Sequence, residues 1–148
     1  MNLVKRLGRI GPGVALAGLV AACGSIDAHS ETDLVAVQSA CDSADRAVRT
    51  LDAEIRSPNR TSSKVTNLTY TAVVMIHARI SEAESLPTWT RRAIQEGALT
   101  DAAIVTETGL RFARQATGAA APGDLTVWEA FIARHRANCR PWADELGP

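Results

Sequence analysis

Motifs that would assign an enzymatic activity are missing from this chain. The sequence contains no Gly-rich phosphate loop and no G-x-S-x-G nucleophile elbow. Its three histidines are not spaced as a metal site, which needs at least three suitable ligands. We therefore predict a protein that is not an enzyme, with no catalytic residue, no metal and no cofactor.

Lysine is nearly absent as well. The chain has two lysines, Lys5 and Lys64, and the other basic residues are arginines. No polybasic run is present, so the sequence gives no electrostatic reason to expect binding to nucleic acid or to anionic lipid. Alternating apolar and polar residues, the pattern of half-buried strands, are also almost absent, and the periodicity is close to 3.6 throughout.

The first 22 residues have the layout of a secretory signal. Lys5, Arg6 and Arg9 make a positive start, and every residue from 10 to 22 is apolar or small. This apolar run is shorter than the ~20 residues that a transmembrane helix needs. We therefore expect a targeting segment that is removed from the mature protein.

The end of this segment resembles a known class. Val20-Ala21-Ala22-Cys23 is similar to the lipobox of bacterial lipoproteins, with an aliphatic residue, two small residues and then cysteine. The resemblance implies that Cys23 carries acyl chains such as palmitate and becomes the first mature residue. The protein would then be held at the extracytoplasmic face of a bacterial membrane by this lipid anchor. The alternative is an ordinary cleaved signal peptide, with Cys23 an incidental thiol.

Three parts of the chain follow from this interpretation. Residues 1–22 are the signal peptide, residues 23–31 are a lipidated flexible tether of small and polar residues, and residues 32–148 form one helical domain. Three of the sixteen basic residues but none of the sixteen acidic ones lie in 1–22, so the remainder has a net charge of −3. A mildly acidic domain again argues against nucleic acid as a partner.

The strongest pattern in the domain is one apolar stripe along its first helix. Apolar residues recur there at alternating spacings of three and four: Leu34, Val37, Cys41, Ala44, Val48, Leu51 and Ile55. A second helix should start near Thr61 and end before Pro87. A short helix over 88–97, terminated by Gly97, should precede a third long helix that starts at Thr100-Asp101, and the last helix should bury Trp128.

Four long helices with short connections predict an all-α, up-down four-helix bundle with one extra short helix. In this topology the first and last helices are neighbours, and Cys41 and Cys139 fall near the same end. With Cys23 lipidated, these two cysteines have only each other to pair with, and thiols outside the cytoplasm tend to oxidise. We therefore predict one disulfide between them, with two buried free thiols as the alternative.

Candidate recognition residues are few. Trp89, Arg91 and Arg92 lie between two long helices, and Trp142 lies near the end of the chain. Tryptophan and arginine often anchor interfaces, so these residues are a possible interaction surface. The alternative is that Trp89 and Trp142 are partly buried lids over the ends of the bundle and that the arginines pair with nearby acids.

The remaining polar residues predict no reactive site. His77 and His135 are expected in the helix interfaces, and no carboxylate is expected in an apolar stripe, where burial would raise its pKa. A catalytic role would require either histidine to meet an acid in a cleft. The sequence therefore favours an envelope binding or accessory protein with an envelope protein as partner. The alternative is a carrier of a small apolar or haem-like ligand inside the bundle.

Overall fold

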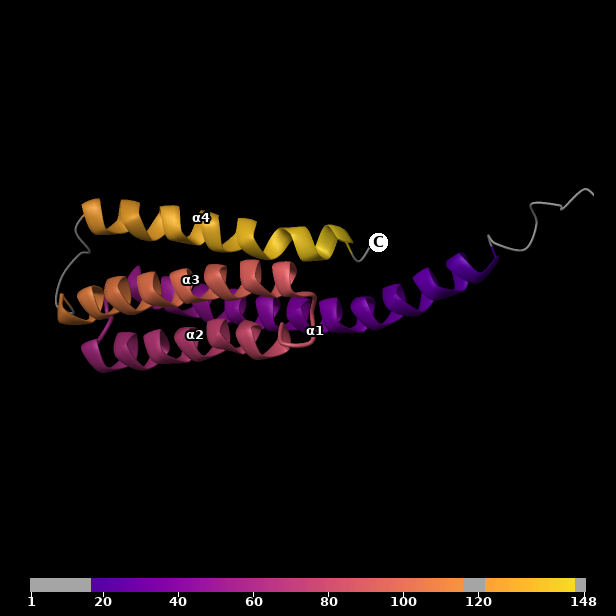
Figure 1. The fold of residues 1–148 in the computed structure, drawn as a ribbon. Helices are drawn as coiled ribbons and strands as arrows, with labels where there is room; N and C mark the ends of the chain where they lie inside the picture. Colours follow the sequence, from indigo (N-terminus) through magenta and orange to yellow (C-terminus); the bar gives the residue numbers. More distant parts are fainter. Residues whose placement is uncertain (1–16, 116–121, 146–148) are drawn as a thin grey trace, which may run out of the picture.

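The computed structural model is a bundle of four helices (Figure 1). It describes the backbone of residues 17–115 and 122–145 and the side chains of 33–115 and 124–139. The helices are α1 (Ala17–Ile55), α2 (Ser62–Glu82), α3 (Thr88–Arg114) and α4 (Pro122–Glu145). Each helix packs against the next in the chain, and α4 also packs against α1. This closed up-down arrangement confirms the predicted four-helix bundle.

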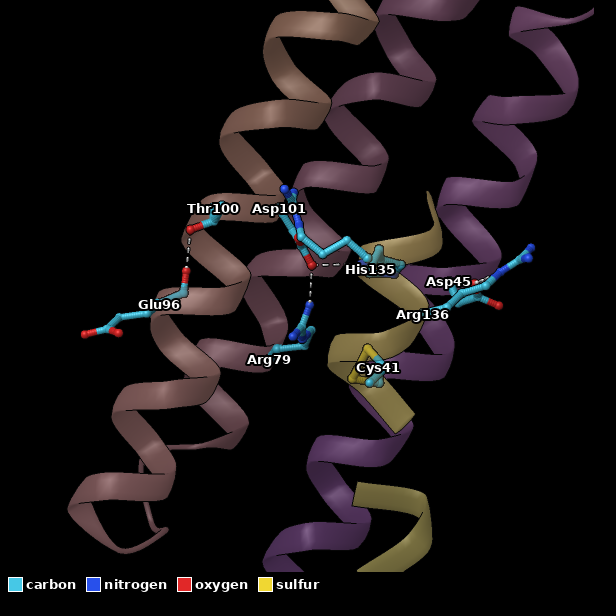
Figure 2. Close-up of polar contacts among 10 residues, drawn as sticks. Cys41, Asp45, Arg79, Glu96, Thr100, Asp101, His135 and Arg136 are labelled. Atoms are coloured by element: carbon cyan, nitrogen blue, oxygen red, sulfur yellow. Dashed lines mark hydrogen bonds and ion pairs between the residues drawn. A yellow bond between two sulfur atoms is a disulfide. The ribbon is translucent and has the colours of Figure 1, made fainter. Parts of the chain in front are cut away.

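The predicted short helix over 88–97 is wrong as a separate element. Helix α3 runs without a break from Thr88 to Arg114. Thr100, expected to cap a new helix, instead donates its hydroxyl to the Glu96 carbonyl oxygen at 2.9 Å, inside a continuous helix (Figure 2). Gly97 does not end the helix either, because burial of Ile94 and Ala98 on its two sides stabilises the helical conformation. Tertiary packing therefore overrides the weak local signal of a single glycine.

Helix α1 is longer than the other three. Its N-terminal part projects past the ends of α2 and α3, and the C-terminal end of α4 lies on the same side (Figure 1). The backbone of residues 23–31, predicted as a flexible tether, belongs to this helix rather than to an irregular segment. The side chains of these residues, Cys23 included, and the whole of residues 1–16 lie outside the described part of the chain.

The predicted stripe of α1 is the centre of the fold. Six of its seven residues are buried, and Leu34 packs at the edge. The core consists of two apolar clusters along the bundle. The larger contains Leu51, Phe112 and Trp128, and the smaller contains Val37, Leu86 and other residues around Cys41.

The disulfide lies in the smaller cluster. Cys41 of α1 is bonded to Cys139 of α4, with their Cα atoms 5.7 Å apart and a sequence separation of 98. The predicted pairing is therefore confirmed.

At the opposite end of the bundle, Arg60 caps the C-terminal ends of α1 and α3. The side chain is buried and donates from Nη1 to the Ile55 carbonyl oxygen at 2.9 Å and from Nη2 to the Gln115 carbonyl oxygen at 3.1 Å. These carbonyls belong to the C-terminal turns of α1 and α3, which have no partners within their own helices. Positive charge is also favourable at the C-terminal end of a helix. One arginine therefore provides hydrogen-bond donors to both carbonyl oxygens and links the C-terminal ends of α1 and α3.

Candidate functional site

A buried carboxylate, Asp101 of α3, joins three helices. Its Oδ2 accepts from Arg79 Nη1 of α2 at 3.1 Å and from His135 Nδ1 of α4 at 3.0 Å. Its Oδ1 accepts from Arg134 Nη2 at 3.3 Å. Asp101 and His135 have no exposed surface and Arg79 has 1%, whereas the Arg134 side chain is 42% exposed. Figure 2 shows the contacts of Asp101 with Arg79 and His135.

This cluster separates the two apolar clusters of the core. On α2, Arg79 lies between Ile76 of the larger cluster and Ala83 of the smaller, and on α4, His135 lies between Phe131 and Cys139. The His135 ring also stacks on Phe131, with their centroids 5.7 Å apart. Burial of charged groups across the middle of the bundle carries an unfavourable desolvation free energy. Only hydrogen bonds of good geometry between these groups can offset it.

The environment keeps the Asp101 carboxyl ionised. Burial by itself raises its pKa. The hydrogen bond from His135, the electrostatic attraction to His135 and the charge and hydrogen bond of Arg79 together outweigh burial, so the pKa lies below its ordinary value of 3.8. Asp101 is therefore an acceptor for both Arg79 and His135, and His135 Nδ1 carries the shared proton.

The expectation that no carboxylate lies in an apolar stripe is wrong for Asp101. The sequence pattern predicts Asp101 at the start of a helix, where acidic residues are common and usually exposed. A signal was nevertheless present. Arg79 follows Ala72 and Ile76 at spacings of four and three, which puts a guanidinium on the buried face of α2. A buried arginine requires a buried acid, and Asp101 is that acid.

The two histidines differ in position. His135 is fully buried, as predicted for a core residue. His77 was also expected in the interface, but it is exposed, because its position on α2 faces away from the other helices. The two rings therefore do not share a site. Within the described residues, no group of three His, Cys, Asp or Glu side chains is placed to hold a metal ion.

His135 also borders a hollow between α1 and α4. The hollow has a volume of about 180 Å³, and its walls are formed by Gln38, Cys41, Asp42, Asp45, His135, Arg136 and Cys139. The disulfide thus forms one wall and the His135 ring another. In Figure 2, His135 lies between the Asp101–Arg79 pair and the side chains of Asp45 and Arg136.

A second hollow, of about 250 Å³, continues along the same two helices, with Asp52, Arg56 and Glu129 on its walls. On the α1 side of this hollow, Asp52 Oδ1 accepts from the buried Trp128 Nε1 at 2.8 Å and from Arg56 Nε at 2.8 Å. Polar side chains therefore fill much of the groove between α1 and α4.

The predicted interaction residues are only partly described. Trp89 is 74% exposed in the first turn of α3, so the alternative of a partly buried lid is wrong for this residue. Arg92 is exposed one turn further on, whereas Arg91 is half-buried and donates to the Glu84 carbonyl oxygen at 3.2 Å. The side chain of Trp142 lies outside the described residues.

No helix in the described ranges is both long enough and apolar enough to cross a membrane. Comparison of the chain with family models, with curated proteins and with solved structures finds no match in any of the three. The function is therefore inferred from the residues of this chain alone.

Proposed function

We propose that this chain is a lipid-anchored, extracytoplasmic protein of the bacterial envelope that acts by binding another envelope protein. The lipobox-like Val20-Ala21-Ala22-Cys23 supports the anchor, and the apolar segment before it supports export. The Cys41–Cys139 disulfide agrees with an oxidising compartment.

The observation that carries the binding role is the exposure of Trp89. This large side chain is 74% exposed although the domain has only three tryptophans. Arg92 lies three residues further along the same helix, so the two side chains share one face. An exposed tryptophan beside an arginine is the combination that most often anchors a protein interface.

Trp89 is also at the end of the bundle from which the N-terminal part of α1 projects. Helix α3 begins there, next to the turn that follows α2 (Figure 1). An anchor at Cys23 would hold this end toward the membrane. The partner we propose is therefore an envelope protein that meets the domain on its membrane-facing end, with an apolar pocket for the indole.

A binding role also agrees with the chemistry of the buried cluster. His135 is oriented by an acid, as in many catalytic pairs, and it borders a hollow. The described walls of that hollow contain no hydroxyl nucleophile, and both cysteines there are tied in the disulfide. An oriented base without a nucleophile favours binding over covalent catalysis.

The anchor is tested by intact-mass spectrometry of the protein extracted from the membranes of its own host. We expect a mature chain that begins at Cys23 and is heavier by the mass of the acyl groups. Cys23→Ala is the control, and its product should lack the added mass and stay out of the membrane fraction. A wild-type chain that is cut elsewhere and carries no lipid would refute the anchor.

The binding surface is tested by placing a photo-crosslinking amino acid at position 89 in the living host. Tyr70 of α2 is the matched control, because it is also aromatic and 57% exposed but belongs to another helix. We expect one discrete crosslinked protein from position 89 that is absent from position 70. Equal crosslinking at both positions, or none at position 89, would contradict the proposed surface.

The alternative function is a carrier of a small apolar or haem-like ligand inside the bundle. The core positions described above are occupied by the protein's own side chains, such as Leu51, Phe112 and Trp128. The hollow beside His135 has a volume of about 180 Å³, below the ~300–1,000 Å³ of sites for drug-sized ligands. Native mass spectrometry of the same extract tests this alternative, since a retained ligand adds mass that is lost on unfolding.

A further inference from the structure

The outer face of α2 is exposed along the helix and contains no acidic residue, lysine or arginine. Six exposed residues recur on this face at alternating spacings of four and three: Ser63, Asn67, Tyr70, Val74, His77 and Ser81. We name these six residues the outer stripe of α2. Tyr70 and Val74, near its middle, are 57% and 61% exposed. Between Lys64 and Glu82 the only charged residue is Arg79, which is buried.

The other helices differ from α2 in this respect. The exposed faces of α1, α3 and α4 carry charged side chains along their length, such as Arg46, Glu96 and Arg134. Helix α2 lies on the opposite side of the bundle from α4 (Figure 1), so its outer face borders solvent. Depletion of charge together with an exposed tyrosine is typical of the centre of a protein interface.

The spacing of the outer stripe is that of a helix–helix contact. Residues at alternating spacings of four and three stay on one side of a helix, where they can all face one partner helix. Thr71, which lies beside the stripe, donates its hydroxyl to the Asn67 carbonyl oxygen at 3.0 Å. This hydroxyl therefore keeps a hydrogen bond when water leaves the surface. The stripe is suited to pack against another helix.

The charges at the two ends of the stripe indicate which helix that is. Lys64 lies in the first turn of α2 and Glu82 is its last residue. They are ten and eight positions from Val74, in opposite directions, and lie on the same side of the stripe. If the same helix of a second copy lies antiparallel and is centred on Val74, Lys64 of each copy is therefore close to Glu82 of the other.

The residues between the two ends also suit a second copy. In the antiparallel arrangement Val74 meets Val74, Tyr70 meets His77 and Asn67 meets Ser81 of the other copy. No like charges face each other in these pairs, and a tyrosine ring beside an imidazole buries aromatic surface. A second copy thus supplies opposite charge at both ends of the stripe and uncharged surface between them.

A hollow beside the stripe has room for the lysine. It lies between α1 and α2, has a volume of about 340 Å³ and is lined by Ala36, Ser39, Ala40, Ser43, Met75, Ala78 and Glu82. Most of these side chains are small, so the alkyl stem of Lys64 from the other copy can lie along them with its ammonium group at Glu82. Lys64 also contacts Glu54 of its own α1, but its side chain is 65% exposed and can extend to a second copy.

We propose that two copies of this chain pair through the outer stripes of their α2 helices, antiparallel and with Val74 on the two-fold axis. The stripe is about 27 Å long. One helix pair of this length buries less than the ~800 Å² per partner of a standard interface, so we expect a weak dimer with a dissociation constant on the order of 10 µM.

This pairing does not depend on the lipid anchor or on the surface around Trp89. Helix α2 packs along the side of the bundle, whereas Trp89 lies at the end where α3 begins. If each copy carries an anchor at Cys23, the two anchors lie at opposite ends of the dimer. The dimer then lies along the membrane surface.

The dimer is measured with a photo-crosslinking amino acid at position 70 of the full chain in the living host. We expect a product with the mass of two chains, in which position 70 is joined to residues 74–81 of the second copy. A parallel pair would instead join position 70 to residues close to 70. Leu99 of α3 is the matched control position, because it is also large, apolar and 55% exposed, and it should give no two-chain product.

Position 74 provides the sharpest test because this residue meets its own copy. Val74→Asp and Val74→Lys each place two like charges together on the axis, and each should reduce the two-chain product about tenfold. Val74 is exposed, so neither change disturbs the core. Leu99→Asp and Leu99→Lys make the same changes on α3 and should leave the product unchanged.

Co-expression of the two position-74 variants distinguishes a direct contact from an indirect effect. An acid on one copy then lies beside a base on the other, so the two-chain product should return. Different affinity tags on the two variants show that the restored product contains one copy of each.

A charge reversal tests the antiparallel orientation. Glu82→Lys places two lysines together at each end of the stripe and should reduce the product about fivefold. Glu96→Lys makes the same charge change at an exposed position of α3 and is the control, with no reduction expected.

Several results would overturn this proposal. They are no two-chain product from position 70, equal product from positions 70 and 99, or no recovery when the two position-74 variants are co-expressed. Attachment close to residue 70, or to a different protein, would also overturn it. Loss of the crosslinked partner at position 89, with the two-chain product at position 70 intact, would contradict the proposed function alone.

Discussion

Asp101 and His135 meet across the interface of α3 and α4, with Oδ2 and Nδ1 3.0 Å apart and neither residue exposed to solvent. The same Oδ2 atom accepts from Arg79 of α2. This one oxygen therefore fixes the axial positions of α2, α3 and α4 relative to one another. A shift of any of these helices by one turn along its axis would leave a buried charge without a partner. Apolar packing alone tolerates such shifts more readily.

Asp101→Asn should destabilise the fold strongly. The amide keeps the shape of the side chain but removes the charge that compensates the buried Arg79. Removal of one partner from a buried ion pair typically costs about 3–5 kcal/mol, a large part of a net stability of ~5–15 kcal/mol. Urea unfolding followed by circular dichroism measures the loss. Asp42→Asn, on the exposed face of α1, is the control and should stay within about 0.5 kcal/mol of wild type.

The stability that Asp101 provides should depend on pH in the acid range. Its pKa in the folded protein is below the ordinary value of 3.8, so the unfolded chain takes up the proton first as the pH falls. The contribution is complete above that value and is lost as the pH falls from 3.8 through the lower pKa of the folded state. The stability difference between wild type and Asp101→Asn should therefore be constant near neutral pH and shrink in this window. A difference that stays constant down to the acid limit would contradict the assignment.

The disulfide should contribute much of the stability of the domain. Cys41 and Cys139 are 98 residues apart in sequence, and the chain-entropy model gives ~4.7 kcal/mol for a loop of about this size. The double variant Cys41→Ser/Cys139→Ser avoids an unpaired thiol and should melt roughly 10–20 °C lower than the oxidised wild type. Reduced wild type is the control and should melt close to the double variant. An unchanged melting temperature would mean that packing alone holds α4.

Sequence reasoning succeeded where one strong periodic signal decided the outcome. The stripe of α1 predicted the bundle and the inward position of Cys41, and the topology then predicted Cys139 as its partner. The prediction was wrong where the burial of a residue depends on its partner on another helix and not on its residue type. Asp101 was treated as a surface acid, although only the position of Arg79 on another helix reveals its burial.

The hollow beside His135 was beyond prediction for a related reason. Its walls combine residues of α1 and α4 that are about 100 positions apart, and their relative rotation follows from packing and not from periodicity. The pairing of Asp52 with Trp128 has the same origin. The exposure of Trp89 was also undecided by the sequence, because a tryptophan at a helix start can pack over the end of a bundle or point outward.

The two described glycines of α3 should respond in opposite ways to alanine. A methyl group at Gly109 would lie 2.7 Å from Thr69 Cγ2 and 3.0 Å from Thr69 Cβ, because α2 and α3 approach closely there. Gly109→Ala should therefore cost about 1–3 kcal/mol through overpacking. A methyl group at Gly97 would meet its nearest neighbours, Arg79 Nη2 and Asn138 Nδ2, at 3.8 and 3.9 Å, which are ordinary contacts.

Gly97→Ala is thus the matched control, and it should be neutral or stabilise the protein by up to about 1 kcal/mol through helix propensity. The new methyl at position 109 would also meet Thr69 Oγ1. Thr69→Ala removes both Oγ1 and Cγ2, so in the double variant Gly109→Ala should cost less than it does alone. Urea unfolding of the wild type, the single variants Gly109→Ala and Thr69→Ala, and the double variant gives the coupling free energy between positions 69 and 109. If Gly109→Ala were as harmless as Gly97→Ala, the close approach of α2 and α3 at Thr69 would be refuted, because an added carbon cannot share that space with the threonine side chain.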